Sequence, residues 1–215
     1  MHMAKSLIKS NSQIAIAGNI GAGKTTMTNL LSDFLKLEPV FESVDHNPYL
    51  ADFYDDMSRW SFNLQIFFLH NRFSNQIKLM KLNKGFIQDR SIYEDREIFA
   101  RNLKDLNFMS SRDWSTYTSL FDDMVQFIRE PDLIIYLKAS TQTLIGRIKN
   151  RNREYEKDIS SEYIHSLNIY YEKWISKIES DKVLIIDTNN FNIFEDKVEF
   201  ENIKEKIINK FQMKC

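Results

Sequence analysis

Eight residues near the N-terminus constrain the fold of this chain more than any other stretch. The segment from Gly18 to Thr25 reads Gly-Asn-Ile-Gly-Ala-Gly-Lys-Thr and matches the phosphate-binding pattern G-x-x-x-x-G-K-S/T. An apolar run over residues 13–17 predicts a buried strand before it, and apolar residues at helical spacing over residues 25–36 predict a helix after it. A glycine-rich turn between a strand and a helix leaves backbone N–H groups unpaired, and the helix dipole adds positive potential there. We therefore expect the chain to bind a nucleoside triphosphate.

The same pattern predicts roles inside this segment. We expect Lys24 to reach the β- and γ-phosphates, and the Thr25 hydroxyl to ligate Mg²⁺. The residues expected to hold ATP here are Gly18, Asn19, Ile20, Gly21, Ala22, Gly23, Lys24, Thr25 and Thr26. The group that receives the phosphate has to be found elsewhere in the chain.

Composition narrows the class of protein. The chain has 215 residues, is 43% hydrophobic and 27% charged, and carries a net charge of −1, which is typical of a soluble globular protein. This near-neutral charge argues against a nucleic-acid or membrane-surface partner. The single cysteine, Cys215, excludes a disulfide framework, and no apolar run approaches the roughly 18 residues of a membrane span, so we expect a cytoplasmic protein. Residues 1–12 are expected to be an N-terminal extension, disordered or left over from cloning, and residues 13–215 a single domain.

Apolar runs alternate with helical patterns along the chain, which predicts an α/β fold with a five-stranded parallel sheet flanked by helices. Strands are expected over residues 13–17, near 39–42, and over 86–89, 133–137 and 183–187. Further helices are expected over residues 60–82, 141–150, about 160–180 and about 194–213. Because ligands bind at the carboxyl ends of the strands in such a sheet, the residues that follow each strand are candidate site residues.

Charged residues follow the second and third expected strands. The Glu42 carboxylate can accept a proton from a substrate hydroxyl, and a solvated structural acid is an equally good interpretation. Asp89 ends the third strand beside the phosphate loop, where it can hold Mg²⁺ through water, and Arg90 can clamp developing negative charge. Glu94 is explained by the preference of acids for the first turn of a helix.

Two helical stretches offer contacts for a flat ring. One face of the helix over residues 60–82 carries Gln65, Phe68 and Arg72, and the amide and the guanidinium there can hydrogen-bond to a base. Spacing alone favours another interpretation, in which this face packs in the core and the two polar side chains extend to the solvent. Asp95 and Phe99 are four residues apart and share a face of the helix after Arg90.

The densest basic cluster of the chain spans residues 147–157. A run of this kind is often a solvated helix face. In a chain with a phosphate loop we favour a mobile lid whose arginines close over the triphosphate.

These segments together resemble the deoxyribonucleoside kinases, the group of deoxyadenosine, deoxyguanosine and deoxycytidine kinases. The likeness covers nearly the whole chain and rests on residues 18–25, 59–65, 89–100 and 147–156, which occur in the order of that family. The resemblance implies a P-loop kinase fold with a helical lid. It also implies transfer of the ATP γ-phosphoryl group, with Mg²⁺, to the 5′-hydroxyl of a deoxyribonucleoside, with deoxyadenosine favoured and deoxyguanosine or deoxycytidine as alternatives.

The resemblance assigns catalytic and substrate-binding roles by position. Glu42 corresponds to the carboxylate that activates the 5′-hydroxyl and Arg90 to the arginine beside it; Asp89 corresponds to the acid near the metal and is the alternative base. The substrate-binding positions are Tyr54 and Glu156 for the 3′-hydroxyl, Gln65 for the base edge, Phe99 for stacking on the base, and Arg72 with Asp95 for the polar pair of purine- and cytosine-preferring members. Phe68 lies where some relatives carry a small residue, so we expect a pocket of different shape.

On the ATP side, the resemblance implies lid arginines and an adenine-binding loop. The corresponding residues are Arg147, Arg151, Arg153, Asn189 and Phe191. Two departures from the family pattern remove no chemical group. Ser43 follows Glu42 where proline is common, and Asn152 stands in the lid where glycine is common; asparagine tolerates the left-handed backbone that glycine would supply.

The resemblance also implies a homodimer formed through helices and feedback inhibition by a deoxynucleoside triphosphate. Two other classes remain as alternatives. A nucleoside monophosphate kinase would need a cationic site for the phosphate of its acceptor, whereas Gln65, Tyr54 and Glu156 suit a neutral acceptor rich in hydroxyls. A nucleotide-binding switch without kinase chemistry is the other, but the Asn-Lys-x-Asp motif of small GTPases is absent.

Overall fold

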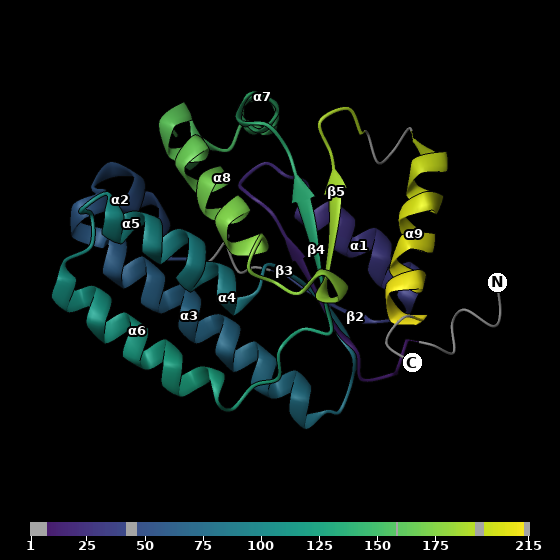
Figure 1. Cartoon of the computed structure of the whole chain (residues 1–215). Helices are drawn as coiled ribbons and strands as arrows, with labels where there is room; N and C mark the ends of the chain where they lie inside the picture. The colour runs from purple at the N-terminus through teal and green to yellow at the C-terminus, as the bar shows by residue number, and fades with distance from the viewer. Residues whose placement is uncertain (1–7, 42–46, 158, 192–195, 213–215) are drawn as a thin grey trace.

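The computed structural model describes residues 8–41, 47–157, 159–191 and 196–212. Its centre is one five-stranded sheet with the strand order β2-β3-β1-β4-β5, in which every neighbouring pair is parallel (Figure 1). The strands are β1 (Gln13–Ala17), β2 (Glu38–Val40), β3 (Phe86–Asp89), β4 (Leu133–Lys138) and β5 (Val183–Asp187). The prediction of a five-stranded parallel sheet is confirmed.

Helices connect consecutive strands of this sheet, and one more helix, α9 (Lys197–Gln212), follows the last strand. The connecting helices are α1 (Lys24–Leu35), α2 (Leu50–Asp55), α3 (Met57–Lys81), α4 (Ile92–Glu94), the π-helix η2 (Asp95–Ala100), α5 (Arg101–Asp105), α6 (Ser111–Val125), α7 (Thr141–Arg151), the 3₁₀-helices η3 (Glu154–Glu156) and η4 (Ser180–Lys182), and α8 (Ser161–Ile175). In Figure 1, α1 and α9 lie on one side of the sheet, and α3, α4, α6 and α8 lie on the other.

The alternation of residues along β1 explains these two layers. Ile14 and Ile16 point into the core that contains α1 and α9, while Ala15 and Ala17 point into the opposite core. The small alanine side chains leave room there for larger rings, such as the buried Tyr136. Both faces of the central strand are thus covered, as a parallel sheet requires.

One predicted boundary is wrong. The helix expected to continue to about residue 180 ends at Ile175, and the chain then turns through η4 into β5. Ile178 packs against the core within this turn, so burial rather than a glycine or proline determines where the helix ends.

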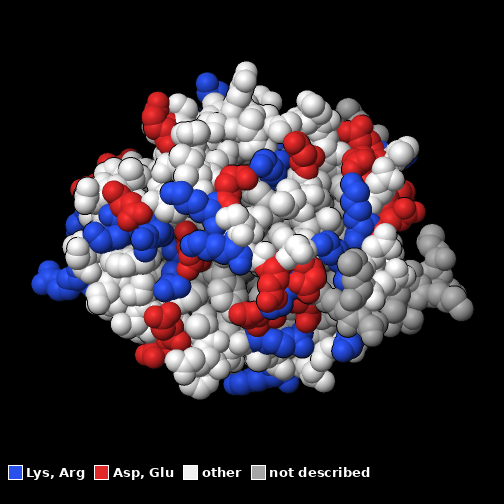
Figure 2. Space-filling view, viewed as in Figure 1, with Lys and Arg blue, Asp and Glu red and all other residues white. Residues whose placement is uncertain are grey.

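The surface matches the near-neutral composition. Acidic and basic side chains are interspersed over the described part of the face shown in Figure 2. Across the described residues, no helix has both the length and the apolar character that a membrane crossing requires.

Two glycines in this fold allow a matched test of its packing. A Cβ atom at the buried Gly85 would lie 2.7 Å from Leu37 Cδ2 and 2.7 Å from Ser12 O, whereas a Cβ atom at the exposed Gly146 in α7 would meet nothing within 4 Å. We expect Gly85→Ala to lower the free energy of unfolding by about 1–3 kcal/mol. Gly146→Ala should raise it by about 0.5–1 kcal/mol, because alanine restricts the unfolded chain and favours the helix. Urea denaturation measures both changes, and shifts of the same sign would contradict this packing.

Candidate active site

The phosphate-binding loop is a tight turn between β1 and α1. Gly21 and Gly23 adopt left-handed backbone conformations, with φ of 82° and 92°. A side chain at Gly21 would bring its Cβ within 3.0 Å of Leu144 O, so the turn needs glycine for both conformation and space. Lys24 is buried at the start of α1, and its Nζ donates to Asn19 O at 3.0 Å, which folds the side chain back over the loop.

Asp89 lies beside this loop because β1 and β3 pair in parallel with Ile16 opposite Asp89. The Thr25 hydroxyl donates to Asp89 Oδ2 at 2.6 Å. The other carboxylate oxygen, Asp89 Oδ1, is buried and has no hydrogen-bond partner among the described residues.

The Thr25 hydroxyl and the Asp89 carboxylate are oxygen ligands of the kind that Mg²⁺ prefers. Mg²⁺ also keeps several bound waters at such sites. The described residues contain no group of three or more histidine, cysteine or acidic side chains placed to hold a metal. A magnesium ion here would therefore be shared between Thr25, Asp89, water and substrate phosphates.

Arg90 follows the strand in a strained conformation. Its φ of 72° lies in the left-handed region, which only a few per cent of non-glycine residues adopt. The side chain is buried, and its guanidinium carbon lies 4.1 Å from the centre of the Phe99 ring. A buried cation therefore lies between the phosphate loop and the Phe99 ring.

Arg72 of α3 supports that strained backbone from behind. Its Nη1 donates to Asp89 O at 3.2 Å and to Arg90 O at 3.1 Å, and its Nε donates to Asp95 Oδ2 at 2.6 Å. Arg72 lines a small neighbouring cavity together with Phe68. The structure thus places Arg72 against the backbone after β3, with Asp95 between it and the main cavity.

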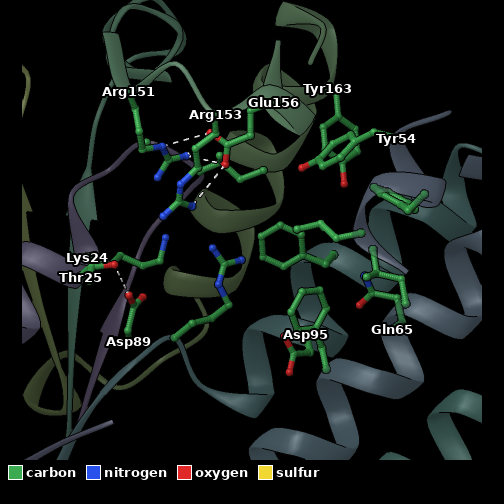
Figure 3. Close-up of a pocket in the computed structure, with 18 of the residues that line it drawn as sticks. Lys24, Thr25, Tyr54, Gln65, Asp89, Asp95, Arg151, Arg153, Glu156 and Tyr163 are labelled. Atoms are coloured by element: carbon green, nitrogen blue, oxygen red, sulfur yellow. Dashed lines mark hydrogen bonds and ion pairs between the residues drawn. The ribbon is translucent and has the colours of Figure 1, made fainter. Parts of the chain in front are cut away.

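A cavity of about 340 Å³ extends from the phosphate loop to α3. Figure 3 shows Lys24, Thr25 and Asp89 at one side of it and Gln65 at the other. Its lining includes Ile20, Gly21, Lys24, Thr25, Phe41, Leu50, Phe53, Tyr54, Leu64, Gln65, Phe68, Asp89, Arg90, Asp95, Phe99, Arg151, Arg153, Glu156 and Tyr163. This volume is at the lower end of the range for small-molecule sites.

A buried amide lies at the end of the cavity farthest from the loop, and an acidic side chain lines the cavity between the two. Gln65 is 2% exposed, and its Oε1 is buried without a hydrogen-bond partner among the described residues. Asp95 begins the π-helix η2, and Phe99 of the same helix lines the same cavity. A buried amide oxygen of this kind needs an N–H donor, which a bound molecule can supply.

The basic stretch after β4 reaches this cavity with two of its arginines. Arg151 makes a bidentate pair with the buried Glu156 (Nη2 to Oε1 at 2.6 Å and Nε to Oε2 at 3.1 Å), and Arg153 Nη1 lies 3.7 Å from Glu156 Oε1 (Figure 3). Asn152 between them adopts the left-handed backbone expected of it, with φ of 51°. The Glu156 carboxylate thus holds two cations over the cavity.

Arg147, the third arginine of this stretch, points to a second cavity of about 400 Å³ on the other side of the phosphate loop. Its Nη1 donates to Thr188 Oγ1 at 3.2 Å, and its Nη2 donates to Thr188 O. The lining of this second cavity includes Gly23, Thr26, Arg147, Asn189 and Phe191. The residues expected on the ATP side therefore divide between two cavities that share the phosphate loop.

Several features of the site were not predicted. Tyr163 of α8 lines the main cavity, and burial raises its pKa above the ordinary value, so its hydroxyl stays neutral. Its spacing with Ile164 and Leu167 is that of a core stripe, which hides it in the sequence. The π-helix η2 was also not predicted; such segments are frequent at functional sites.

Glu42 lies outside the described residues, while its neighbour Phe41 lines the main cavity.

An all-parallel sheet whose phosphate loop faces a cavity, with two arginines paired with Glu156 at its rim, is the arrangement of a P-loop kinase. The family model described as "Deoxynucleoside kinase" matches residues 14–212, and the chain belongs to that family. It is 43% identical over 202 residues to the deoxyadenosine/deoxycytidine kinase of Bacillus subtilis, with 93% of each chain covered.

Two further relatives are similar. The chain is 46% identical over 160 residues to the deoxyadenosine kinase of Dictyostelium discoideum, which covers 74% of this chain and 65% of that protein. The solved structure of the M. mycoides deoxyadenosine kinase with bound dATP superimposes with a TM-score of 0.79 at 35% identity, and covers 91% of this chain and 98% of that one. The expected P-loop kinase fold is confirmed.

The contacts of Arg72 generate a stability prediction. The side chains of Arg72 and Asp95 are 10% and 3% exposed. Arg72→Met removes a cation that offsets the buried Asp95 carboxylate, so we expect the free energy of unfolding to fall by about 3–5 kcal/mol. The double variant Arg72→Met/Asp95→Asn should recover part of that loss.

Arg101 provides the control, because its pair with Asp105 is 51% and 45% exposed. Arg101→Met should change stability by less than about 1 kcal/mol. Urea denaturation measures the free energy of unfolding of all variants. Equal losses of this free energy for Arg72→Met and Arg101→Met would show that Arg72 is not a buried support.

Proposed function

We propose that this chain transfers the γ-phosphoryl group of ATP to the 5′-hydroxyl of deoxyadenosine, with deoxycytidine and deoxyguanosine as alternative acceptors. The observation that carries the choice of acceptor is the buried Gln65 Oε1 at the end of the main cavity away from the phosphate loop. A nucleoside placed with its base at this end directs its sugar toward Lys24, Thr25 and the loop.

The amide of Gln65 can read the edge of a base with two hydrogen bonds. With its oxygen on an exocyclic amino group and its nitrogen on the neighbouring ring nitrogen, it pairs with adenine or cytosine. Turned by 180°, the same amide matches the carbonyl and ring N–H of guanine or thymine, so Gln65 alone does not choose between the bases. The Asp95 carboxylate adds an acceptor in the lining of the same cavity, which favours a base with an amino group. The Bacillus subtilis relative is named for deoxyadenosine and deoxycytidine, which agrees with this pattern.

The aromatic and acidic residues around the cavity suit a neutral nucleoside. Phe68 and Phe99 supply apolar walls for a flat ring, and we assign Tyr54 and Glu156 to the 3′-hydroxyl. Glu156 then exchanges part of its pairing with Arg151 and Arg153 for the sugar, which leaves the arginines available to the triphosphate. A nucleoside monophosphate would bring its own negative charge close to Glu156, which disfavours it as the acceptor.

The chemistry requires proton removal and charge stabilisation. We assign the proton of the 5′-hydroxyl to Glu42, with Asp89 as the alternative acceptor. Thr25 and Asp89 are the residues that would hold the Mg²⁺ that accompanies ATP, and a cation there would offset negative charge on the phosphates. Lys24, Arg90 and the lid arginines supply the remaining positive charge, and lid closure excludes water that would hydrolyse ATP.

The homodimer and the feedback inhibition by a deoxynucleoside triphosphate stay predictions. Sedimentation velocity tests the first, and inhibition by dATP at varied ATP concentrations tests the second. The M. mycoides deoxyadenosine kinase was solved with bound dATP, which supports the second expectation.

Base recognition can be tested on the four common deoxynucleosides. We expect kcat/KM to be highest for deoxyadenosine, followed by deoxycytidine, and lowest for thymidine. Gln65→Leu should lower kcat/KM for deoxyadenosine at least about tenfold, because it removes both hydrogen bonds to the base edge. Gln126→Leu, at an exposed glutamine after α6, is the control and should behave as wild type. Equal kcat/KM values for all four nucleosides, or an unaffected Gln65→Leu, would contradict this assignment.

The catalytic base can be identified with two amide substitutions. Glu42→Gln should lower kcat by about 10²–10⁴-fold and leave ATP affinity intact, because general bases contribute effects of this size. Asp89→Asn should instead raise the Mg²⁺ concentration needed for half-maximal rate, because it weakens the expected metal ligand. Steady-state rates across a Mg²⁺ titration separate the two. Near-normal turnover of Glu42→Gln would transfer the role of base to Asp89.

A further inference from the structure

Glu94 is a fully buried acid that the proposed reaction does not use. It is 0% exposed, although the first-turn acids Asp52 and Glu162 of other helices lie at the surface. The preference of acids for helix starts is satisfied at the surface, so it does not explain this burial. A buried carboxylate needs several hydrogen-bond donors to offset its lost hydration, and the donors around Glu94 identify what it holds.

The carboxylate joins two segments of the active site. Its Oε1 accepts a hydrogen bond from Gly18 N, the first amide of the phosphate loop, at 3.3 Å. Its Oε2 accepts from Ser91 N at 2.8 Å and from Ser91 Oγ at 3.3 Å. Ser91 directly follows Asp89 and Arg90, so one side chain connects the start of the loop to the segment with the expected metal ligand and the strained arginine.

Tyr171 of α8 completes this connection. Its hydroxyl lies 2.7 Å from Gly18 O and 2.8 Å from Glu94 Oε1, and it donates its one proton to either oxygen. The ring stacks on Tyr136, with centroids 5.6 Å apart and an interplanar angle of 13°, and its edge meets Phe99 of the cavity wall. Burial raises the pKa of Tyr171 well above its ordinary value, so the hydroxyl stays a donor at physiological pH.

A second contact from α8 holds the next residue of the loop. Asn19 Nδ2 donates to Ile164 O at 2.9 Å and to Asn168 Oδ1 at 2.7 Å. Gly18 through its backbone and Asn19 through its side chain are thus tied to elements outside the β1–α1 unit. The loop's position depends on α8 and on the start of α4, as well as on its own glycines.

We propose that Glu94 and Tyr171 are positioning residues that lock the phosphate loop to the Asp89-Arg90-Ser91 segment, so that the donor phosphates and the acceptor keep one relative geometry. Neither side chain lines the main cavity or the second cavity, so both act through Gly18 and Ser91. The expected effect on turnover rests on the proposed kinase function. The link between the loop and the Asp89-Arg90-Ser91 segment rests on the buried contacts alone.

The hydroxyl of Tyr171 is the most direct target. Tyr171→Phe keeps the stacked ring and removes only the contacts to Gly18 and Glu94. We expect kcat to fall about ten- to a hundredfold, because a small displacement of aligned groups is costly in phosphoryl transfer. The Kd for deoxyadenosine should stay within about twofold of wild type, because the acceptor contacts are untouched. Backbone amide exchange over residues 18–25 should be faster than in wild type.

Tyr170→Phe is the matched control. It removes a tyrosine hydroxyl from the adjacent position of α8, where the hydroxyl donates to Asp105 at the surface. This variant should retain wild-type kcat and wild-type exchange over the loop. Thermal unfolding of both variants establishes a temperature at which each is folded, so that a general loss of structure is separated from a local one.

Glu94→Gln provides a second, independent variant. Its amide NH₂ must face either Gly18 N or Ser91 N, so one of these two backbone N–H groups loses its acceptor. The double variant with Tyr171→Phe should reduce kcat by less than the product of the single effects, because the residues share one connection.

Amide exchange can be measured without turnover, so it tests the link even in a protein that phosphorylates no nucleoside. A wild-type protein that phosphorylates no nucleoside would overturn only the proposed function. The inference itself is overturned if Tyr171→Phe and Glu94→Gln match Tyr170→Phe in loop exchange. It is equally overturned if an active wild type and both variants have the same kcat.

Discussion

The parallel pairing of β1 with β3 is the constraint on which the site depends. With Ile16 opposite Asp89, the carboxyl ends of both strands stop at the same edge of the sheet. That alignment brings the Asp89 carboxylate within hydrogen-bonding distance of Thr25 in the phosphate loop. Arg90, the next residue, leaves the strand in a left-handed conformation and lines the cavity. The phosphate loop after β1 and the charged residues at the end of β3 lie side by side because the two strands end at the same edge of the sheet.

Buried polar contacts then hold these segments in place. Arg72 fixes the carbonyls of Asp89 and Arg90 from the helix side, and Glu94 with Tyr171 fixes the loop entrance. Each of these groups is costly to bury and is offset by several hydrogen bonds. Such groups restrict the site to one geometry, which is the main contribution a protein makes to phosphoryl transfer. The arginines around the end of α7 differ, because Arg151 and Arg153 pair with Glu156 while their own side chains are 35% and 38% exposed.

The sequence predicts the parts of this molecule that depend on local pattern. The apolar runs of β4 and β5, the glycine-rich loop and the basic stretch after β4 all lie where the pattern indicates. Contacts between distant segments were missed, because nothing local marks them. Tyr171 is 153 positions from Gly18 and has the spacing of a core residue, and Glu94 has an ordinary explanation at a helix start. The π-helix from Asp95 was missed because its extra residue per turn leaves no sequence signature.

The central claim is that the cavity aligns one particular hydroxyl of a deoxynucleoside with the phosphate loop. The most direct test is the position of phosphate in the product when the protein is incubated with MgATP and deoxyadenosine, as read by ³¹P–¹H coupling in NMR spectra. The proposed base contact at Gln65, the proposed sugar contacts at Tyr54 and Glu156, and the loop at the opposite end of the cavity predict deoxyadenosine 5′-monophosphate as the sole nucleotide product. Phosphate on the 3′-hydroxyl, or release of inorganic phosphate without a nucleotide product, would contradict this account of the site.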